Sequence, residues 1–406
     1  MAKTTVLTLC DYYLPGYKAG GPITTLANMV VRLEPDLEFL IVTRDHDLGS
    51  TQAYAGITPN TLHAVGGAQV QYLSVQEKRA KILRDILTSY DYDILYLNSL
   101  FSPTFTIWPL LLRRSGLIPK RPVILAPRGE LFPGALSLKK WKKHCYLHSA
   151  RTLRLYRGLI WQASSVHEEL EIRRWFGQRA QVMVAPDLTS MQFDLLADVP
   201  PAVKRPGLLK VLFLSRICAP KNLLGVLAML KNVRGRIELN IVGPLEEQAY
   251  WRRCQNIIRT LPKNITVNYS GAVMPAQVLH VMGQHDLFFL PTLGENFGHV
   301  ILEALSASCP VLISDQTPWQ GLEAEGAGWD LPLNRPELFQ TALQTCVDMD
   351  SRSFTELRQR ARDYAARYCS SDNNTLQMNR DLFSAACQSS KPDRTPERQD
   401  RRRAAA

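Results

Sequence analysis

Short apolar runs alternate with helical patterns along the first half of the chain. Between the runs, residues 23–33 and 76–89 carry apolar side chains at the three- and four-residue spacing of an amphipathic helix. Alternating β and α units favour a mostly parallel sheet with helices on both faces, so we expect such a domain over residues 1–186. The predicted strands occupy residues 6–10, 37–42, 94–97, 123–126 and 181–185.

The alternation stops near residue 186 and then begins again. Four prolines (Pro186, Pro200, Pro201 and Pro206) stand among polar and acidic residues, which predicts a linker over 187–207. A second domain of the same kind is expected over 208–350, followed by helices over 351–388. The tail, 389–406, is rich in proline and arginine and is expected to be disordered. The predicted strands of the second domain occupy residues 209–214, 237–242, 265–269, 287–290 and 311–313.

Composition supports a globular chain with two cores. The chain has 406 residues, of which 46% are hydrophobic and 21% charged, and this length exceeds what one ordinary core holds. No apolar run reaches the roughly 18–20 residues that a membrane span needs, and the first residues show no signal peptide. The eight cysteines form no Cys-x-x-Cys pair, so we expect reduced thiols in a cytosolic protein.

The net charge of +11 is concentrated in one segment. Residues 101–150 carry nine Lys or Arg and one acidic residue, and residues 131–161 contain no Asp or Glu. Basic and apolar side chains alternate from Lys139 to Arg157, as in a helix on an anionic membrane surface. A solvated helix with one side in the core is the alternative. Nucleic acid is disfavoured, because no nucleic-acid motif accompanies the charge.

The segment 291–303 carries the most specific chemistry. It follows an apolar strand and contains Glu295 and Glu303, eight residues apart, which would place both carboxylates along one line of a helix. Gly294 and Gly298 bracket the expected helix start, where free N–H groups favour an anion. Carboxylates beside an anion site suit hydroxyl groups next to a phosphate. The pattern therefore indicates a nucleotide sugar.

A second motif lies upstream, over residues 212–222. It is predicted as a strand, a turn and then a helix over 223–230, and it carries Arg216 and Lys221. With the first motif it resembles the retaining glycosyltransferases of family 4, from about residue 6 to 388. The resemblance implies the GT-B architecture of two doubly wound, Rossmann-like α/β domains facing a central cleft, with the last helices packed back across both domains.

The resemblance also implies roles for single residues. Arg216 and Lys221 would clamp the donor diphosphate, Glu303 would accept hydrogen bonds from the nucleotide ribose, and Glu295 would hold the transferred sugar. A second set would approach the diphosphate, the sugar or the nucleotide base mainly through backbone groups. These residues are Gly20, Gly21, Asn296, Phe297, Gly298, Gly271 and Val273.

One position departs from the family pattern. Many relatives carry histidine in a Pro-His-Gly triplet where this chain has Pro127-Arg128-Gly129. A histidine role therefore cannot be transferred, and we expect Arg128 to line the site and contact sugar or acceptor phosphate, oriented by Glu130. We predict catalysis without a metal, because Arg216 and Lys221 would neutralise the diphosphate. Asp-x-Asp pairs occur, and only that of Asp45 and Asp47 follows a strand end.

The sequence thus predicts a retaining hexosyl- or N-acetylhexosaminyl-transferase that uses a UDP-, GDP- or ADP-sugar. The expected acceptor is a lipid-linked glycan of a cell-surface polysaccharide or lipopolysaccharide pathway. The basic segment implies a cytoplasmic protein attached peripherally to the inner face of the plasma membrane. Two alternatives are another enzyme on the same fold, such as a nucleotide-sugar epimerase or phosphorylase, and a non-catalytic membrane-surface scaffold.

Overall fold

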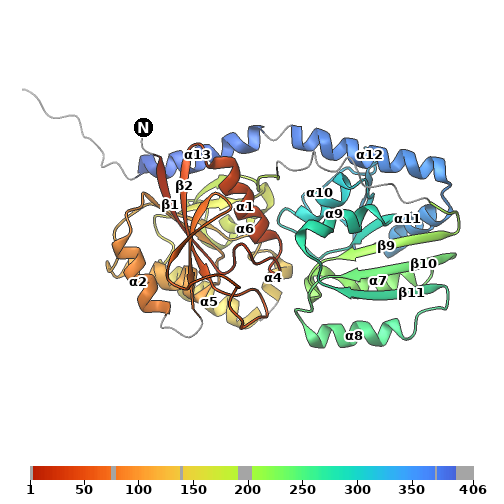
Figure 1. Cartoon of the computed structure of the whole chain (residues 1–406), viewed down its shortest axis with the longest axis horizontal. Helices are drawn as coiled ribbons and strands as arrows, with labels where there is room; N and C mark the ends of the chain where they lie inside the picture. The colour runs from red at the N-terminus through yellow and green to blue at the C-terminus, as the bar shows by residue number, and fades with distance from the viewer. Residues whose placement is uncertain (1–2, 75–78, 138–139, 191–203, 371–372, 390–406) are drawn as a thin grey trace, which may run out of the picture.

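The computed structural model describes residues 3–74, 79–137, 140–190, 204–370 and 373–389. Two α/β halves lie side by side along the long axis of the molecule (Figure 1). Each half is built on one sheet with helices on both faces. The predicted fold class of two doubly wound α/β domains is confirmed.

The first half contains a sheet of eight strands in the order β3-β4-β2-β1-β5-β6-β7-β8. All neighbouring strands are parallel except β3 and β4, which form an antiparallel pair at one edge. The sequence pattern did not predict this hairpin. The strands are β1 Thr4–Cys10, β2 Leu37–Arg44, β3 Leu62–Val65, β4 Ala68–Leu73, β5 Ile94–Asn98, β6 Val123–Ala126, β7 Ile160–Ala163 and β8 Gln181–Val184.

The second half contains a fully parallel sheet of six strands in the order β11-β10-β9-β12-β13-β14. The edge strand β14 was not predicted, because its Gly-Trp-Asp-Leu sequence lacks a run of β-branched residues. The strands are β9 Leu208–Leu214, β10 Arg236–Val242, β11 Ile265–Gly271, β12 Leu287–Leu290, β13 Val311–Ser314 and β14 Gly328–Leu331.

The helices and helical turns connect these strands. The bounds in the first half are α1 Gly21–Leu33, α2 Arg79–Ser89, η1 Pro103–Ile107, α3 Trp108–Arg114, α4 Pro133–Ser137, α5 Lys140–Thr152 and α6 Val166–Phe176. Those in the second half are η3 Ala219–Lys221, α7 Leu223–Leu230, α8 Gln248–Ile258, α9 Pro275–Gly283, α10 His299–Ser306 and α11 Pro336–Asp348. The chain ends in α12 Ser351–Ser370 and α13 Asn373–Ser389.

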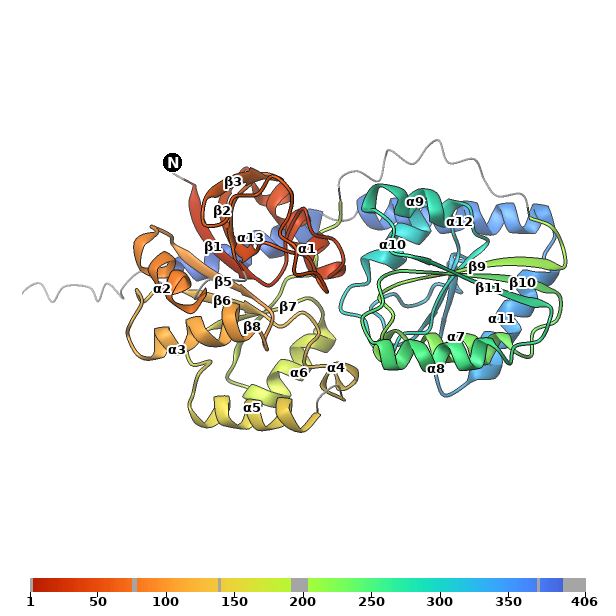
Figure 2. The same ribbon diagram turned by 60° about the horizontal axis from the view of Figure 1, so that its bottom comes forward.

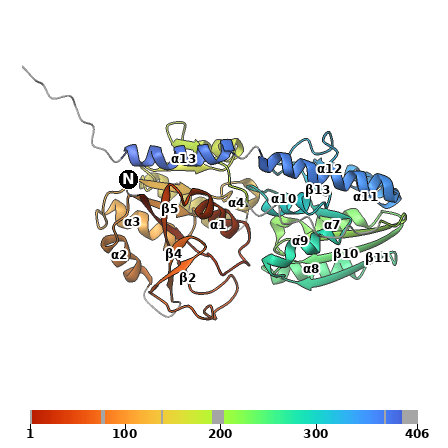
Figure 3. The ribbon, with the colours of Figure 1, turned by 45° about the horizontal axis from the view of Figure 1, so that its top comes forward.

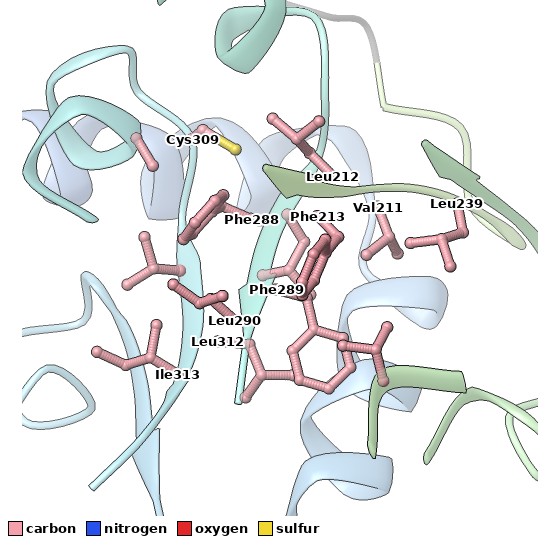
Figure 4. Packing of buried hydrophobic residues seen from close by; sticks show 14 of the residues in the cluster. Val211, Leu212, Phe213, Leu239, Phe288, Phe289, Leu290, Cys309, Leu312 and Ile313 are labelled. Carbon is pink, nitrogen blue, oxygen red and sulfur yellow. The ribbon is translucent and has the colours of Figure 1, made fainter. Parts of the chain in front are cut away.

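The central strands are apolar throughout because both of their faces are buried. In the second half, Phe288 and Phe289 of β12 are fully buried on opposite faces of the sheet, Phe289 beside Phe213 of β9 and Phe288 on the side of Cys309 (Figure 4). Helices α7 and α8 lie on one side of this sheet, and α9, α10 and α12 lie on the other (Figure 2). The parallel strands thereby bring all their carboxyl ends to the edge that faces the first half.

The last two helices run end to end along both halves (Figure 3). Helix α12 packs against α10, and Arg358 donates to the carbonyls of Gly283 and His285. Helix α13 lies on the first sheet, where the ring of Phe383 contacts Phe39 and Tyr96 edge to face. The carboxyl end of the chain therefore braces both sheets.

Most of the basic segment folds as helix α5, which follows the short helix α4. Lys139, which begins the predicted membrane-contact segment, lies outside the described residues, as do most of the linker (191–203) and residues 390–406 of the tail. Trp141 and Leu153 are 69% and 60% exposed, whereas Leu147 is buried in the core. Among the helices that the structure describes, none has the length and apolarity to cross a membrane.

Candidate active site between the two halves

A cavity of about 650 Å³ lies between the two halves. The first half contributes the loop after β1, the beginning of α1 and the segment from β6 to α5. The second half contributes the ends of β9 and β10, residues 272–278 and the segment 293–303. These segments follow the carboxyl ends of parallel strands, where doubly wound folds bind ligands.

The two sequence motifs meet on the second half of the cavity wall. The backbone N–H of Leu293 donates to the carbonyl of Pro220 at 2.8 Å, and the amide of Asn222 donates to the carbonyl of Pro291 at 2.9 Å. Asn222 is left-handed (φ 57°), and its side-chain oxygen caps the first turn of α7 through the N–H of Gly225. These bonds hold the loop that carries Lys221 against the loop that carries Glu295.

Lys221 and Glu295 form an ion pair through Nζ and Oε1, and both side chains are only slightly exposed. Arg216 pairs with Glu246 at 2.7 Å, and here each side chain is about one-third exposed. Both cations line the cavity, and each is held by a carboxylate that a bound anion could replace. The free site is thus close to electrically balanced.

Helix α10 begins at His299. The eight-residue spacing of the two glutamates had implied a helix that already includes Glu295, four residues earlier. Glu295 therefore lies in the loop before the helix, and the prediction that it shares a helical line with Glu303 is wrong. The reason is Gly298, which adopts φ 80° as the N-cap and offers no side-chain cap. The first N–H groups of α10 are left without a side-chain partner beside the cavity, which favours an anion there.

Glu303 lines the cavity from the second turn of α10. Burial raises the pKa of its carboxyl group to about 7. Within the described residues, no hydrogen bond or ion pair reaches its carboxylate. A partly buried carboxylate without a partner is costly, and such a group is typical of a ligand site.

Arg128 lines the cavity as predicted, but its donors are used within the protein. Its side chain is buried and donates to Asp187 Oδ1 at 2.5 Å, to Tyr96 Oη at 2.5 Å and to Asn98 Oδ1 at 3.0 Å. This arrangement makes Arg128 a structural residue of the first half. The prediction that it contacts a substrate stays untested.

Glu130 does not orient Arg128, and that expectation is wrong. Its carboxylate accepts from the backbone N–H groups of Leu100 and Phe101 and from the hydroxyl of Ser99 at 2.9 Å. Burial raises the pKa of this carboxyl group. Glu130 instead fixes the turn that follows β5.

The glycine loop of the first half is held by Asp47, which lies three residues after the end of β2. Asp47 accepts from the backbone N–H groups of Tyr17 and Lys18 at 2.9 and 3.2 Å. Gly20 follows with φ 72° as the N-cap of α1, which again has no side-chain cap. Asp47 therefore holds a loop, and the described residues contain no group of three or more His, Cys, Asp or Glu suited to a metal ion.

The structure brings nearly all the predicted residues to this cavity. Gly271 is the exception, since its neighbour Ala272 lines the wall in its place. Sequence reasoning missed the polar lining residues Thr25, Asp187, Glu246 and His299, of which the last lies within the segment 291–303. It also missed Ser164, whose hydroxyl contacts Asn296 beside the cavity. The lining residues that were predicted are Gly20, Gly21, Arg128, Arg216, Lys221, Val273, Glu295, Asn296, Phe297, Gly298 and Glu303.

Comparison with known proteins agrees with the two-domain α/β fold and identifies the family that the second half resembles. Residues 199–368 match the family described as glycosyl transferases group 1. No curated protein matches the sequence. Sucrose-phosphate synthase from Thermosynechococcus elongatus superposes with a TM-score of 0.69 at 16% identity, covering 94% of this chain and 100% of that chain.

Two further solved structures are similar over nearly the whole chain. HepE from Anabaena in complex with UDP and glucose has a TM-score of 0.64 at 16% identity, covering 95% of this chain and 100% of its own. The E. coli trehalose-6-phosphate protein bound with UDP-2-fluoro glucose has a TM-score of 0.65 at 11% identity, covering 95% and 99%. At these identities the likeness concerns the fold. The domain match and the fold together support a glycosyltransferase of the GT-B type.

Proposed function

We propose that this chain is a retaining glycosyltransferase of family 4. It would move a sugar from a nucleotide-diphosphate sugar to a lipid-linked glycan acceptor. The observation that carries the proposal is the meeting of Arg216, Lys221, Glu295 and Glu303 in one cavity beside the uncapped start of α10. Two cations, two carboxylates and a helix N-terminus match a diphosphate with hydroxyl groups on either side.

The cations would stabilise the leaving diphosphate. When the donor binds, its phosphate oxygens would replace Glu246 at Arg216 and Glu295 at Lys221. Negative charge grows on the diphosphate as the bond to the sugar breaks, so both cations would interact more strongly in the transition state than in the ground state. Because this positive charge is already present, we propose catalysis without a metal ion.

Glu295, released from Lys221, would accept hydrogen bonds from the transferred sugar. Glu303 would accept hydrogen bonds from the ribose, which gives its isolated carboxylate the partners that it lacks. For retention, the acceptor oxygen would bond to the anomeric carbon on the face from which the diphosphate leaves. The acceptor proton would pass to the departing phosphate oxygen, so that no covalent nucleophile from the protein is required.

The solved neighbours guide the choice of nucleotide. HepE holds UDP and glucose, and the trehalose-6-phosphate protein holds UDP-2-fluoro glucose. For this chain we therefore propose a UDP-hexose as the first donor to test. GDP- and ADP-sugars are the next in order.

The basic surface of α5 supports a membrane-bound acceptor. Lys143 lines the cavity, and from there α5 runs outward along the first half (Figure 2). The exposed Trp141 and Leu153 stand among basic side chains, a combination that favours the interface of an anionic membrane. We propose that the protein binds the inner face of the plasma membrane there and takes its acceptor from the lipid, in cell-surface polysaccharide or lipopolysaccharide synthesis.

A thermal-shift screen tests the donor site. UDP, GDP, ADP and their glucose derivatives are added to the wild type, to Glu303→Ala and to Glu323→Ala, a matched change at an exposed glutamate outside the cavity. We expect one nucleotide to raise the unfolding temperature of the wild type and of Glu323→Ala, and to do so much less in Glu303→Ala.

The same screen separates the alternatives. A non-catalytic scaffold would show no shift with any nucleotide. An epimerase would bind the nucleotide sugar and convert it in the absence of an acceptor, which chromatography of the sugar product detects. Either result would replace the transferase proposal.

A further inference from the structure

One buried hydrogen bond joins the two halves beside the cavity. The hydroxyl of Thr25, in the second turn of α1, lies 2.8 Å from Nε2 of His299, the first residue of α10. Both side chains are buried, with 2% and 8% exposure. The bond therefore links the two helices whose N-terminal ends face the cavity, one from each half.

The direction of this bond is fixed by its neighbours. The single hydroxyl proton of Thr25 is donated to Asp187 Oδ2 at 2.8 Å, and Asp187 is held by the guanidinium of Arg128. The Thr25 oxygen must then accept from an N–H on Nε2 of His299. Burial lowers the pKa of the His299 imidazole, which favours the neutral ring, and the bond to Thr25 places the proton of that ring on Nε2. Arg128, Asp187, Thr25 and His299 thus form one directed chain.

The first half also contacts the loop that carries Glu295. The hydroxyl of Ser164 lies 2.6 Å from Oδ1 of Asn296 and 2.8 Å from Oε2 of Glu168. Gly129 lies so close that a Cβ there would stand 3.2 Å from the Cβ of Asn296. Residues 296 and 299 are therefore both held by the first half, whereas the N–H of Glu295 bonds within the second half, to the carbonyl of Gln316 at 3.0 Å. The position of the Glu295 carboxylate depends on both halves.

We infer that Thr25 and His299 are positioning residues, which place Glu295 against the transferred sugar by holding the two halves together at the start of α10. The inference rests on the proposed function for the role of Glu295. Arg216, Lys221 and Glu303 all belong to the second half, so the main proposed nucleotide contacts do not pass through the bond between the halves. The turnover step needs the bond between the halves. Loss of this bond should lower kcat and leave nucleotide affinity almost unchanged.

Two matched pairs of variants test the bond. Thr25→Val keeps the shape and removes the hydroxyl, and Thr25→Ser keeps the hydroxyl. His299→Leu removes the donor, and His299→Gln can place an amide donor near the position of Nε2. The measurements are hydrogen exchange of residues 293–300, the thermal shift with UDP, and the release of UDP from UDP-glucose. If the screen above selects another nucleotide, that nucleotide and its sugar replace these probes.

We expect Thr25→Val and His299→Leu to exchange residues 293–300 about tenfold faster and to release the nucleotide about tenfold more slowly. Their nucleotide-induced thermal shifts should match that of the wild type. Thr25→Ser and His299→Gln should recover most of the loss. Unchanged exchange in Thr25→Val and His299→Leu would overturn the inference, and so would a Thr25→Ser variant as impaired as Thr25→Val.

The two proposals fail in different ways. A wild type that binds none of the nucleotides contradicts the proposed function. In that case the exchange data still decide whether the Thr25–His299 bond holds the loop. Where Thr25→Val unfolds, Ser164→Ala removes the neighbouring contact to Asn296 and should raise the exchange of the same loop.

Discussion

The charged residues of the two halves are satisfied in different ways. In the first half, the side chains of Arg128 and Glu130 each bond to several groups of that same half. In the second half, Arg216 has one carboxylate partner and is one-third exposed, while Glu303 has no partner among the described residues. A saturated charge holds a fold together, whereas an unsaturated charge beside a cavity can bind a ligand.

Position at a strand end therefore does not by itself decide whether a charged residue binds a ligand. Arg128 and Arg216 both follow the carboxyl end of a parallel strand and both line the cavity. What separates them is the number of internal acceptors within reach. Substitution of the arginine in the first half should therefore mainly lower stability, whereas substitution of the arginine in the second half should mainly lower activity.

Arg128→Met and Arg216→Met should differ strongly in how much unfolding free energy they lose. Arg128→Met leaves Asp187 buried without its cation, which typically costs about 3–5 kcal/mol of unfolding free energy. Arg216→Met breaks a partly exposed pair and should cost less than about 1 kcal/mol. Urea unfolding of both variants measures these costs. Equal losses in the two variants would contradict the comparison.

The catalytic effect should run the other way. Arg216→Met removes a cation from the leaving diphosphate, and loss of one such contact commonly lowers kcat about 10²–10³-fold. The surviving folded fraction of Arg128→Met should keep its nucleotide-induced thermal shift. A Leu293→Ala variant, also in the cavity wall but without charge, is the control for general disturbance of the site.

Glu303→Gln offers a smaller effect with a defined pH dependence. The folded pKa is raised to about 7 from 4.5, so between these values the folded state binds the proton more tightly than the unfolded state. The stability that this group contributes is complete below pH 4.5 and is lost as the pH rises to 7. Glutamine cannot ionise, so the variant should be more stable than the wild type at pH 8, by up to about 3 kcal/mol.

The two stabilities should converge near pH 5, where the wild-type carboxyl group is protonated in the folded state. Urea unfolding at pH 5 and pH 8 measures both differences, and the nucleotide-induced shift should be reduced in the variant at either pH. A wild type more stable than Glu303→Gln at pH 8 would show that the carboxylate has a stabilising partner in the free protein.

The sequence predicted the fold best where a residue pattern has one common structural meaning. Paired strand and helix patterns predicted both sheets, because strands buried on both faces must be apolar throughout. Glycines and charged residues at fixed spacing predicted the residues that the second half of the molecule contributes to the cavity wall. The hairpin of β3 and β4 was missed because β3 has only four partly exposed residues, and because two glutamines interrupt the apolar residues of β4, although most of that strand is buried.

The part of the site that the first half of the molecule contributes could not be predicted in the same way. The role of Arg128 depends on Tyr96, Asn98 and Asp187, which are distant in sequence and adjacent only in the fold. The start of α10 depended on a left-handed glycine, and the spacing of two glutamates could not reveal it. Such three-dimensional partnerships become visible only when the chain is folded.

The smallest expected effect concerns the surfaces of the two halves. Lys140→Glu with Lys142→Glu on α5 should weaken binding to vesicles containing phosphatidylserine at least about thirtyfold, at roughly 1 kcal/mol for each basic residue near the membrane. Arg252→Glu with Arg253→Glu on the exposed side of α8 makes the same change of charge in the second half and should leave binding unchanged. Sedimentation with anionic and neutral vesicles at physiological salt measures both pairs. Equal weakening by the two pairs would mean that net charge, and not the α5 surface, governs the attraction, and the proposed membrane contact would then lose its support.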